Sequence, residues 1–226
     1  YNGGAQALVT AGVVENGAVI EFAQAEKGPY SADIPVEVNA GSYQVWYRVA
    51  ETENYTGVSA AEIPNVQIQR KPITPAVELS DYTYLYDGGW KQPKVTVKDG
   101  ETELPNSEYE VNYVNNQNVG TATVKVTDRL GGNYAVAAVD VDFKITLLAQ
   151  AALSISDKPN TVTYGERFTL STSGGSGNGE VTWKITSGGN VAEVDPNSGQ
   201  VTIKGCGTAA VQATKSGTYN GVKNYE

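Results

Sequence analysis

The chain has 226 residues, with 25 acidic against 16 basic residues and a net charge of −9. This acidic balance argues against nucleic acid and anionic membrane surfaces as partners. No apolar run reaches the ~18 residues that span a membrane, so we expect no membrane insertion. The sequence contains no histidine, which removes the usual general base and the commonest metal ligand. Its single cysteine cannot form an internal disulfide.

Three glycines, Gly41, Gly120 and Gly207, open copies of one repeated pattern. Apolar or aromatic residues follow each glycine at offsets of two, four and six, and most odd offsets are polar. This alternation is typical of a strand with one buried face. The glycines are 79 and 87 residues apart, which suits small sandwich domains better than solenoid turns.

Two further anchors accompany the glycines. Asn54-Tyr55 and Asn133-Tyr134 each lie thirteen residues after a glycine, and Thr218-Tyr219 is the looser third copy that this spacing indicates. Tyr1-Asn2-Gly3-Gly4 matches Tyr86-Asp87-Gly88-Gly89. The repeat therefore predicts three segments of about 75 residues.

The predicted fold is all-β, with three tandem Ig-like β-sandwich domains in an elongated arrangement. The domains are residues 1–70, truncated at the N-terminus, residues 71–149, and residues 150–226, truncated at the C-terminus. Abundant glycine and β-branched residues favour short strands and tight turns, and no amphipathic helical period is sustained.

The strands expected in chain order are 6–10, 18–23, 41–50, 63–69, 76–79, 83–86, 94–98, 109–114, 120–127, 139–146, 153–156, 167–171, 179–186, 192–194, 200–204 and 207–214. Residues 70–75 hold two prolines and should form a semi-rigid linker. Residues 147–152 are an apolar second linker, which we expect to be partly buried. Asp195-Pro196-Asn197-Ser198-Gly199 looks like the opening of a calcium loop. However, Cys206 replaces the bidentate glutamate, so a hairpin turn is favoured.

These residues carry family resemblances. Residues 71–149 resemble the Tyr-Asp-Gly type of repeat in surface proteins of gut Firmicutes, through Tyr86-Asp87-Gly88 and Asn118-Val119-Gly120. Residues 1–70 resemble the related MBG-type repeat, through Asn39-Ala40-Gly41. Residues 150–226 resemble bacterial Ig-like domains of the intimin and invasin class, through Val181-Thr182-Trp183. The resemblances imply a stalk or adhesion role on an extracellular protein, either secreted or on the bacterial cell surface.

Two tryptophans are candidate contacts for a glycan or a protein. Trp46 falls on the outward face of its predicted strand, and Trp90 replaces the small Ala5 of the first segment. An exposed indole beside polar groups can stack on a sugar ring. Trp183 alternates with apolar neighbours and should face the core, and Cys206 should be a small buried apolar residue.

We expect no catalytic, cofactor-binding or metal site among the charged residues. Three carboxylate pairs lie two residues apart on predicted strands and should share solvated faces: Glu101 and Glu103, Glu108 and Glu110, and Asp140 and Asp142. Five lysines also fall on polar faces, which argues against an isopeptide bond in the core: Lys98, Lys125, Lys144, Lys184 and Lys204. We therefore expect no enzyme.

Three functional hypotheses follow. The first is a non-catalytic structural and adhesion module, a monomeric stalk or spacer with an unknown protein or glycan partner. The alternative is a carbohydrate-binding module of an extracellular glycoside hydrolase, using Trp46 or Trp90. The second alternative is an isopeptide-stabilised pilin-like domain.

Overall fold

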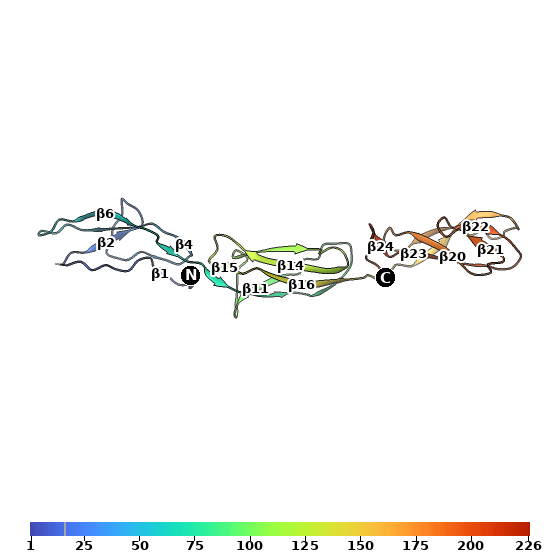
Figure 1. The fold of residues 1–226 in the computed structure, drawn as a ribbon, viewed down its shortest axis with the longest axis horizontal. Coiled ribbons are helices and arrows are strands. Elements are labelled where there is room, and N and C mark those ends of the chain that lie inside the picture. The colour runs from blue at the N-terminus through green and yellow to red at the C-terminus, as the bar shows by residue number, and fades with distance from the viewer. Residues whose placement is uncertain (16) are drawn as a thin grey trace. The chain divides into compact units, whose positions relative to one another are not determined.

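A computed structural model describes residues 1–15 and 17–226, and the regular elements of these residues are all strands (Figure 1). The predicted all-β fold, with sheets suited to β-sandwiches, is therefore confirmed. The chain separates into two compact units. The first comprises Tyr1–Leu79, Val95–Asn112 and Val124–Val141, and the second comprises Ser80–Lys94, Tyr113–Thr123 and Asp142–Glu226. The division into three domains stays a prediction, and residues 1–70, 71–149 and 150–226 are called the first, middle and last segments below.

The first segment forms short antiparallel pairings. Its strands are β1 (Gln6–Ala7), β2 (Ile20–Ala23), β3 (Val36–Glu37), β4 (Gly41–Ser42), β5 (Val45–Val49), β6 (Val58–Ile63) and β7 (Gln67–Ile68). They make the sheet β2-β5-β6 and the pairs β1-β3 and β4-β7. The strand expected at 41–50 is therefore split in two. Phe22, Val45 and Val66 form the buried centre, with Tyr43 and Tyr47 packed against it.

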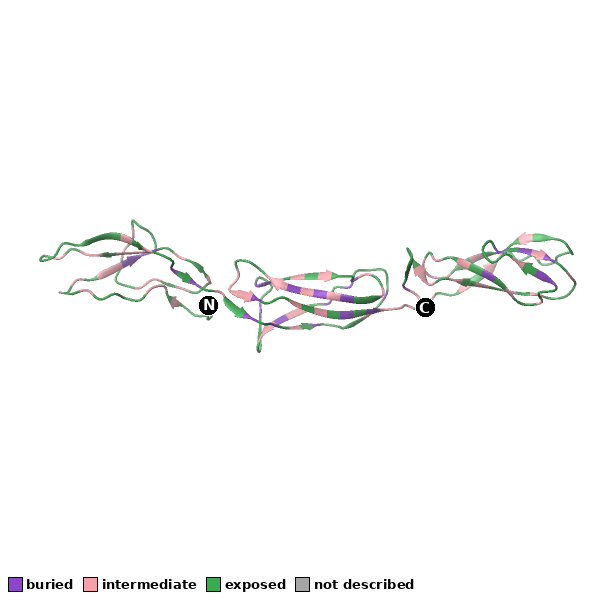
Figure 2. Ribbon diagram, viewed as in Figure 1, coloured by how far each residue is buried: buried purple, intermediate pink, exposed green. Residues whose placement is uncertain are grey.

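The middle segment holds the longest strands. They are β8 (Lys71–Ile73), β9 (Ala76–Leu79), β10 (Thr83–Leu85), β11 (Val95–Asp99), β12 (Thr102–Glu103), β13 (Tyr109–Val114), β14 (Gly120–Asp128), β15 (Tyr134–Val136) and β16 (Val139–Thr146). Their sheets are β10-β16-β14-β13, β12-β11-β9 and β15-β8. Along β14 the buried residues alternate as predicted (Figure 2): Ala122, Val124 and Val126 are fully buried.

The last segment contains β17 (Leu153–Ser156), β18 (Arg167–Thr169), β19 (Ser171–Gly174), β20 (Val181–Ser187), β21 (Ala192–Val194), β22 (Gln200–Ile203), β23 (Ala210–Lys215), β24 (Thr218–Tyr219) and β25 (Val222–Lys223). Its sheets are β17-β19, β18-β22-β21, β20-β23 and β24-β25. Trp183 is buried beside Leu170 and Val201, as predicted. The turn at Asp195 joins the antiparallel strands β21 and β22, so the predicted hairpin is confirmed.

Within the predicted linker, residues 71–73 form the strand β8, and the backbone of Lys71 pairs in parallel with Tyr134. Two predictions about particular residues are wrong. Glu108 is buried rather than solvated, because it precedes β13 and accepts backbone hydrogen bonds. Cys206 is exposed rather than buried, because it lies in the loop before β23 and not in the strand.

Candidate functional site: two repeated junctions and a tryptophan hollow

Asn133 ties the middle segment to the first segment within the first compact unit. Its side-chain Oδ1 accepts a hydrogen bond from the backbone N–H of Ala40 at 2.7 Å, and its Nδ2 donates to Asn39 Oδ1 at 3.2 Å. Its backbone carbonyl accepts from the N–H of Lys71 at 2.9 Å. One asparagine thus binds both the loop before Gly41 and the connection between the segments.

Asn224 makes the same set of bonds in the second compact unit. Its Oδ1 accepts from the N–H of Val119 at 2.9 Å, and its Nδ2 donates to Asn118 Oδ1 at 3.2 Å. Its carbonyl accepts from the N–H of Leu148 at 3.2 Å. The sequence spacing therefore indicated the wrong third copy of this anchor: Asn224-Tyr225, and not Thr218-Tyr219, occupies the equivalent position. Four additional residues between Gly207 and Asn224 conceal this match.

The tyrosine after each clamping asparagine packs on the tyrosine of the second sequence anchor. Tyr134 and Tyr1 form a T-shaped pair with ring centroids 5.4 Å apart, and Tyr225 and Tyr86 form one at the same distance. Edge-to-face rings at this separation attract each other beyond their buried area. Burial and then the neighbouring ring raise the pKa of both Tyr134 and Tyr86.

We call each arrangement an Asn-Tyr clamp, defined by the asparagine, the tyrosine after it, and the loop and ring they contact. The first clamp is Asn133-Tyr134 with Asn39-Ala40 and Tyr1, and the second is Asn224-Tyr225 with Asn118-Val119 and Tyr86. In both, the backbone of the connection pairs in parallel with the clamp tyrosine: Lys71 with Tyr134, and Leu148 with Tyr225. The sequence anchors are therefore halves of a repeated joint.

Charged groups reinforce the first clamp. Arg70 makes a bidentate pair with Asp128, with both N–O distances 2.8 Å, and donates to the carbonyls of Arg129, Gly132 and Tyr134. A planar guanidinium with five donors suits this convergent set of acceptors. The hydrogen bond from Arg70 holds the pKa of Asp128 below its usual range, and the same bond raises the pKa of Arg70.

Glu108 completes this support from the loop before β13. Its carboxylate accepts from the backbone N–H groups of Asn133 at 2.6 Å and Tyr134 at 3.2 Å. Asp128 similarly accepts from the N–H of Val136 at 2.8 Å. Sequence reasoning missed these two carboxylates and Arg70, because most of their partners are backbone groups that leave no motif and Arg70 and Asp128 are 58 residues apart.

The Asn54-Tyr55 copy of this anchor is not clamped. Asn54 and Tyr55 are exposed, with 51% of Tyr55 accessible, whereas Asn224 is completely buried. Tyr55 pairs only locally, through a bridge to Thr52. The same two residue types are therefore compatible with solvent, and the clamped copies are less exposed because a facing loop and ring cover them.

Trp90 lies beside a hollow of about 480 Å³ lined by residues 115–121. The indole is 67% exposed. The buried Asn116 anchors the loop that carries Trp90. Its Nδ2 donates to the carbonyl of Lys91 at 2.8 Å, and its backbone carbonyl accepts from the Lys91 N–H at 2.7 Å. Lys91 Nζ also pairs with Asp87 at 2.5 Å. An exposed indole next to several side-chain amides has the chemistry of a sugar-stacking platform.

Trp46, the other candidate, lies in different surroundings. Val45 and Tyr47 pack into the core, so the alternation of β5 puts Trp46 on the opposite face, where it is half-buried. Arg48 on that face pairs with Glu21 at 2.7 Å and lies over the ring of Tyr30. Trp46 is paired across strands with Ala23 and Glu62 in the first compact unit, whereas Trp90 belongs to the second.

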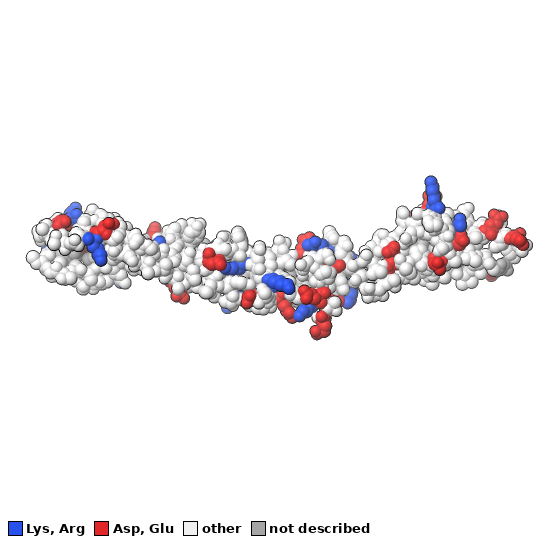
Figure 3. Space-filling view, turned by 180° about the vertical axis from the view of Figure 1, so that it is seen from behind, with Lys and Arg blue, Asp and Glu red and all other residues white. Residues whose placement is uncertain are grey.

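Charged side chains elsewhere form surface pairs. Acidic and basic groups are interspersed on the face shown in Figure 3. Three lysines that the sequence places on polar faces form ion pairs with carboxylates: Lys98 with Glu78, Lys125 with Asp140, and Lys204 with Glu193. Asp195 accepts hydrogen bonds from the N–H and the hydroxyl of Ser198 and from the N–H of Asn197, and these bonds lower its pKa. Its carboxylate is thus engaged in closing the turn.

No protein-family model matches this chain, and no curated protein matches it. The three family resemblances therefore stay predictions. Within residues 1–15 and 17–226, no cluster of potential metal ligands is found. No helix in the same described part is long and apolar enough to span a membrane.

Proposed function

We propose that this chain is a non-catalytic structural and adhesion module, a spacer of an extracellular bacterial protein. The repeated Asn-Tyr clamp is the observation that carries the proposal. Each clamp combines three hydrogen bonds to one asparagine with a tyrosine pair and a stretch of paired connection. Independent domains on flexible linkers move freely by default. Joints of this kind instead restrict bending, and restricted bending is the requirement for a spacer.

Backbone ¹⁵N relaxation tests this proposal. We expect residues on the two sides of each clamp to report one shared rotational diffusion tensor. Asn224→Ala should decouple the motion around the second clamp, while Asn54→Ala, the unclamped copy, should change nothing. Independent tumbling of the segments in the unmodified chain would contradict the spacer function, because the clamps would then not hold.

A second candidate function, carbohydrate binding, is favoured by the Trp90 hollow. Asn115 and Thr121 are exposed lining residues that can bond sugar hydroxyls beside the stacking indole. A glycan array followed by tryptophan fluorescence titration tests it. Binding should be lost in Trp90→Ala and retained in Trp46→Ala, and the reverse result would move the site to β5. If no glycan binds, the carbohydrate-binding function is wrong and the spacer function is unaffected.

The isopeptide-stabilised pilin is the weakest of the three hypotheses. Lys91 is buried, but it pairs with Asp87, whose side chain is largely exposed. An isopeptide bond between them would release one water, and one between lysine and asparagine would release one ammonia. An intact mass equal to that of the linear, uncrosslinked chain would exclude both.

A further inference from the structure

The Trp90 hollow and the second clamp share residues. Asn118 and Val119 line the hollow, and both are bonded to Asn224. The N–H of Val119 donates to Asn224 Oδ1, and Asn118 Oδ1 accepts from Asn224 Nδ2. All of these residues belong to the second compact unit. A ligand in the hollow therefore contacts groups that the clamp holds in place.

The loop that carries the indole is also connected to the second clamp. Trp90 lies four residues after Tyr86, whose ring packs on the clamp tyrosine Tyr225. This loop is bonded to the lining of the hollow, because Gln117 Nε2 donates to the carbonyl of Gly88 at 3.1 Å. Opening of the clamp would therefore release both the lining amides and the loop that positions the indole.

Asn118 shows how a closed clamp prepares the hollow for a ligand. Its Oδ1 accepts from Asn224, which fixes the orientation of the amide and leaves its Nδ2 without a partner among the described residues. Asn118 is exposed, so the two N–H donors of Nδ2 are accessible to a ligand. A group that is already fixed in its binding orientation loses less conformational freedom on binding. The closed clamp should therefore bind a ligand more tightly than the open one.

The lining of the hollow favours a neutral sugar. Within the described residues its polar groups are amides and the hydroxyl of Thr121, and no charged side chain lines it. The nearby Lys91 and Asp87 pair with each other. Amides can bond sugar hydroxyls while the C–H face of a pyranose stacks on the indole. A sugar carboxylate would instead lose hydration without meeting a positive charge.

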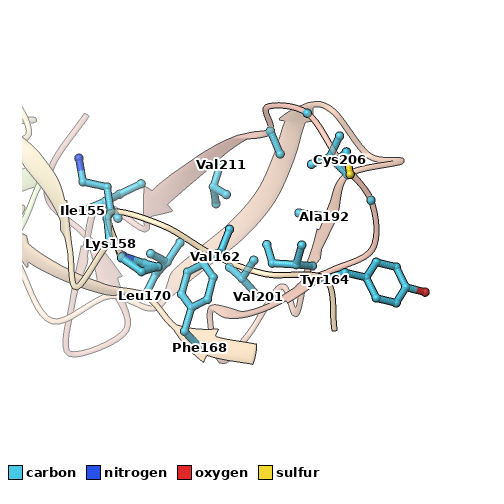
Figure 4. Close-up of a pocket in the computed structure, with 16 residues that line it drawn as sticks. Ile155, Lys158, Val162, Tyr164, Phe168, Leu170, Ala192, Val201, Cys206 and Val211 are labelled. Carbon is cyan, nitrogen blue, oxygen red and sulfur yellow. The ribbon is translucent and has the colours of Figure 1, made fainter. Parts of the chain in front are cut away.

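The other two segments have different residues at the corresponding positions. Ala5 occupies the place of the indole in the first segment. In the last segment Gly205-Cys206-Gly207 aligns with Asn118-Val119-Gly120, and it lines a cavity whose other walls include Val162 and Phe168 (Figure 4). Among the described residues, the middle segment alone thus combines a clamped loop with an indole and several amides.

We propose that the Trp90 hollow binds a neutral pyranose sugar, and that this binding and closure of the second clamp strengthen each other. The inference rests on the carbohydrate-binding function proposed above and adds its ligand class and its regulation. Coupling between two sites is reciprocal: closure raises the affinity for sugar by the same factor by which bound sugar favours closure. The chain would therefore be stiffest at this joint when the hollow is occupied.

The first test titrates the full chain with the methyl glycosides of glucose, galactose, mannose and N-acetylglucosamine, and follows the indole N–H of Trp90 by NMR. With the tightest binder of this panel, Asn224→Ala should weaken binding about tenfold, within the usual range of coupling between sites. Asn133→Ala, which acts on the first clamp, should leave the affinity unchanged. Equal weakening in the two variants would overturn the coupling. Binding of the methyl glycoside of glucuronic acid as tightly as that of glucose would contradict the neutral ligand class.

The reciprocal test measures amide hydrogen exchange at saturating sugar. Exchange at Leu148 should slow about tenfold, the factor found for affinity. The N–H of Leu148 bonds to the carbonyl of Asn224 and lies outside the hollow, so this protection reports the clamp and not coverage by the sugar. Exchange at Lys71 in the first clamp should stay unchanged. Sugar binding without slower exchange at Leu148 would overturn the coupling and leave carbohydrate binding intact, whereas a panel that does not bind would contradict both.

Tyr225→Leu keeps the coupling testable if Asn224→Ala does not fold. It removes the ring pair with Tyr86 and retains Asn224, and Tyr225 is half-buried and outside the hollow. Its affinity for the panel sugar should fall, while Tyr55→Leu, at the unclamped copy, should bind as the unmodified chain does. Full affinity in Tyr225→Leu together with faster exchange at Leu148 would show that the clamp opens without affecting the hollow, and the proposal would be wrong.

Discussion

The two Asn-Tyr clamps share their polar contacts but differ in what surrounds them. Around Asn133 the support is ionic: Arg70 joins Asp128 and three carbonyls, and Glu108 accepts from the clamp backbone. Around Asn224 the corresponding connection is Leu147-Leu148, both half-buried. The clamp is therefore the constant part of the joint, while the supporting residues vary with the segments that it joins.

Removing Arg70 should have the largest effect. Arg70→Ala removes the hydrogen bonds that Arg70 donates to Asp128 and to three carbonyls, and hydrogen bonds to charged groups are each worth about 1.5–3 kcal/mol. We expect the first clamp to open about 3 kcal/mol more easily, seen as hydrogen exchange more than a hundredfold faster at Lys71 and Val136. Arg70→Lys should recover little, because an ammonium lacks the planar fork.

Arg167→Ala is the matched control, since this arginine is exposed on β18. Exchange at Val119 in the second clamp should stay unchanged in both variants. A loss of protection at Val119 equal to that at Val136 would show that Arg70 stabilises the chain globally, and the distinction between ionic and apolar support would fail.

Asn224→Ala should have the next largest effect. Asn224 is completely buried, and its loss leaves the N–H of Val119 and the amide of Asn118 without their partner. An unsatisfied buried group costs about 1–3 kcal/mol. Exchange at Val119 and Leu148 should accelerate accordingly, while Asn54→Ala should change stability by less than about 0.5 kcal/mol. Equal effects at the two asparagines would mean that the clamp contributes nothing specific.

Low pH should weaken the first clamp and leave the second nearly unchanged. Asp128 has a pKa below its ordinary value in the folded chain, so its stabilising contribution is complete above the unfolded pKa, near 4, and declines as the pH falls through the folded pKa. Amide chemical shifts of Val136 should therefore move at the acid end of a titration, and those of Val119 should stay nearly constant. Asp128→Asn should remove the movement. A common midpoint for both amides would indicate global acid unfolding instead.

The sequence predicted the parts of these joints but not their assembly. Alternation identified the core faces of β14 and β23, because a buried strand face requires apolar residues at every second position. The spacing of the repeat also identified Asn133-Tyr134 and the tyrosine anchors as recurring features. It could not show that they meet, because the groups that Asn133 binds in Asn39 and Ala40 lie 94 and 93 residues away in the sequence. Trp90 was singled out as a departure from the repeat, but the hollow beside it depends on the buried Asn116, which a surface-like run of amides conceals.

The smallest expected effect concerns the apolar support of the second clamp. Leu148 is half-buried, so Leu148→Ala removes part of its apolar contact and should cost about 1 kcal/mol, at ~25 cal/mol per Å² of buried surface. Its backbone bonds to Asn224 and Glu226 do not depend on the side chain and should persist. Exchange at Leu148 should therefore accelerate about fivefold, with no dependence on pH or salt. Lys71→Ala, at the equivalent position of the first clamp, removes the ion pair with Asp99, and its effect should instead diminish in high salt. Matching salt dependence in the two variants would show that the clamps are supported in the same way, against the distinction drawn from Arg70 and Leu148.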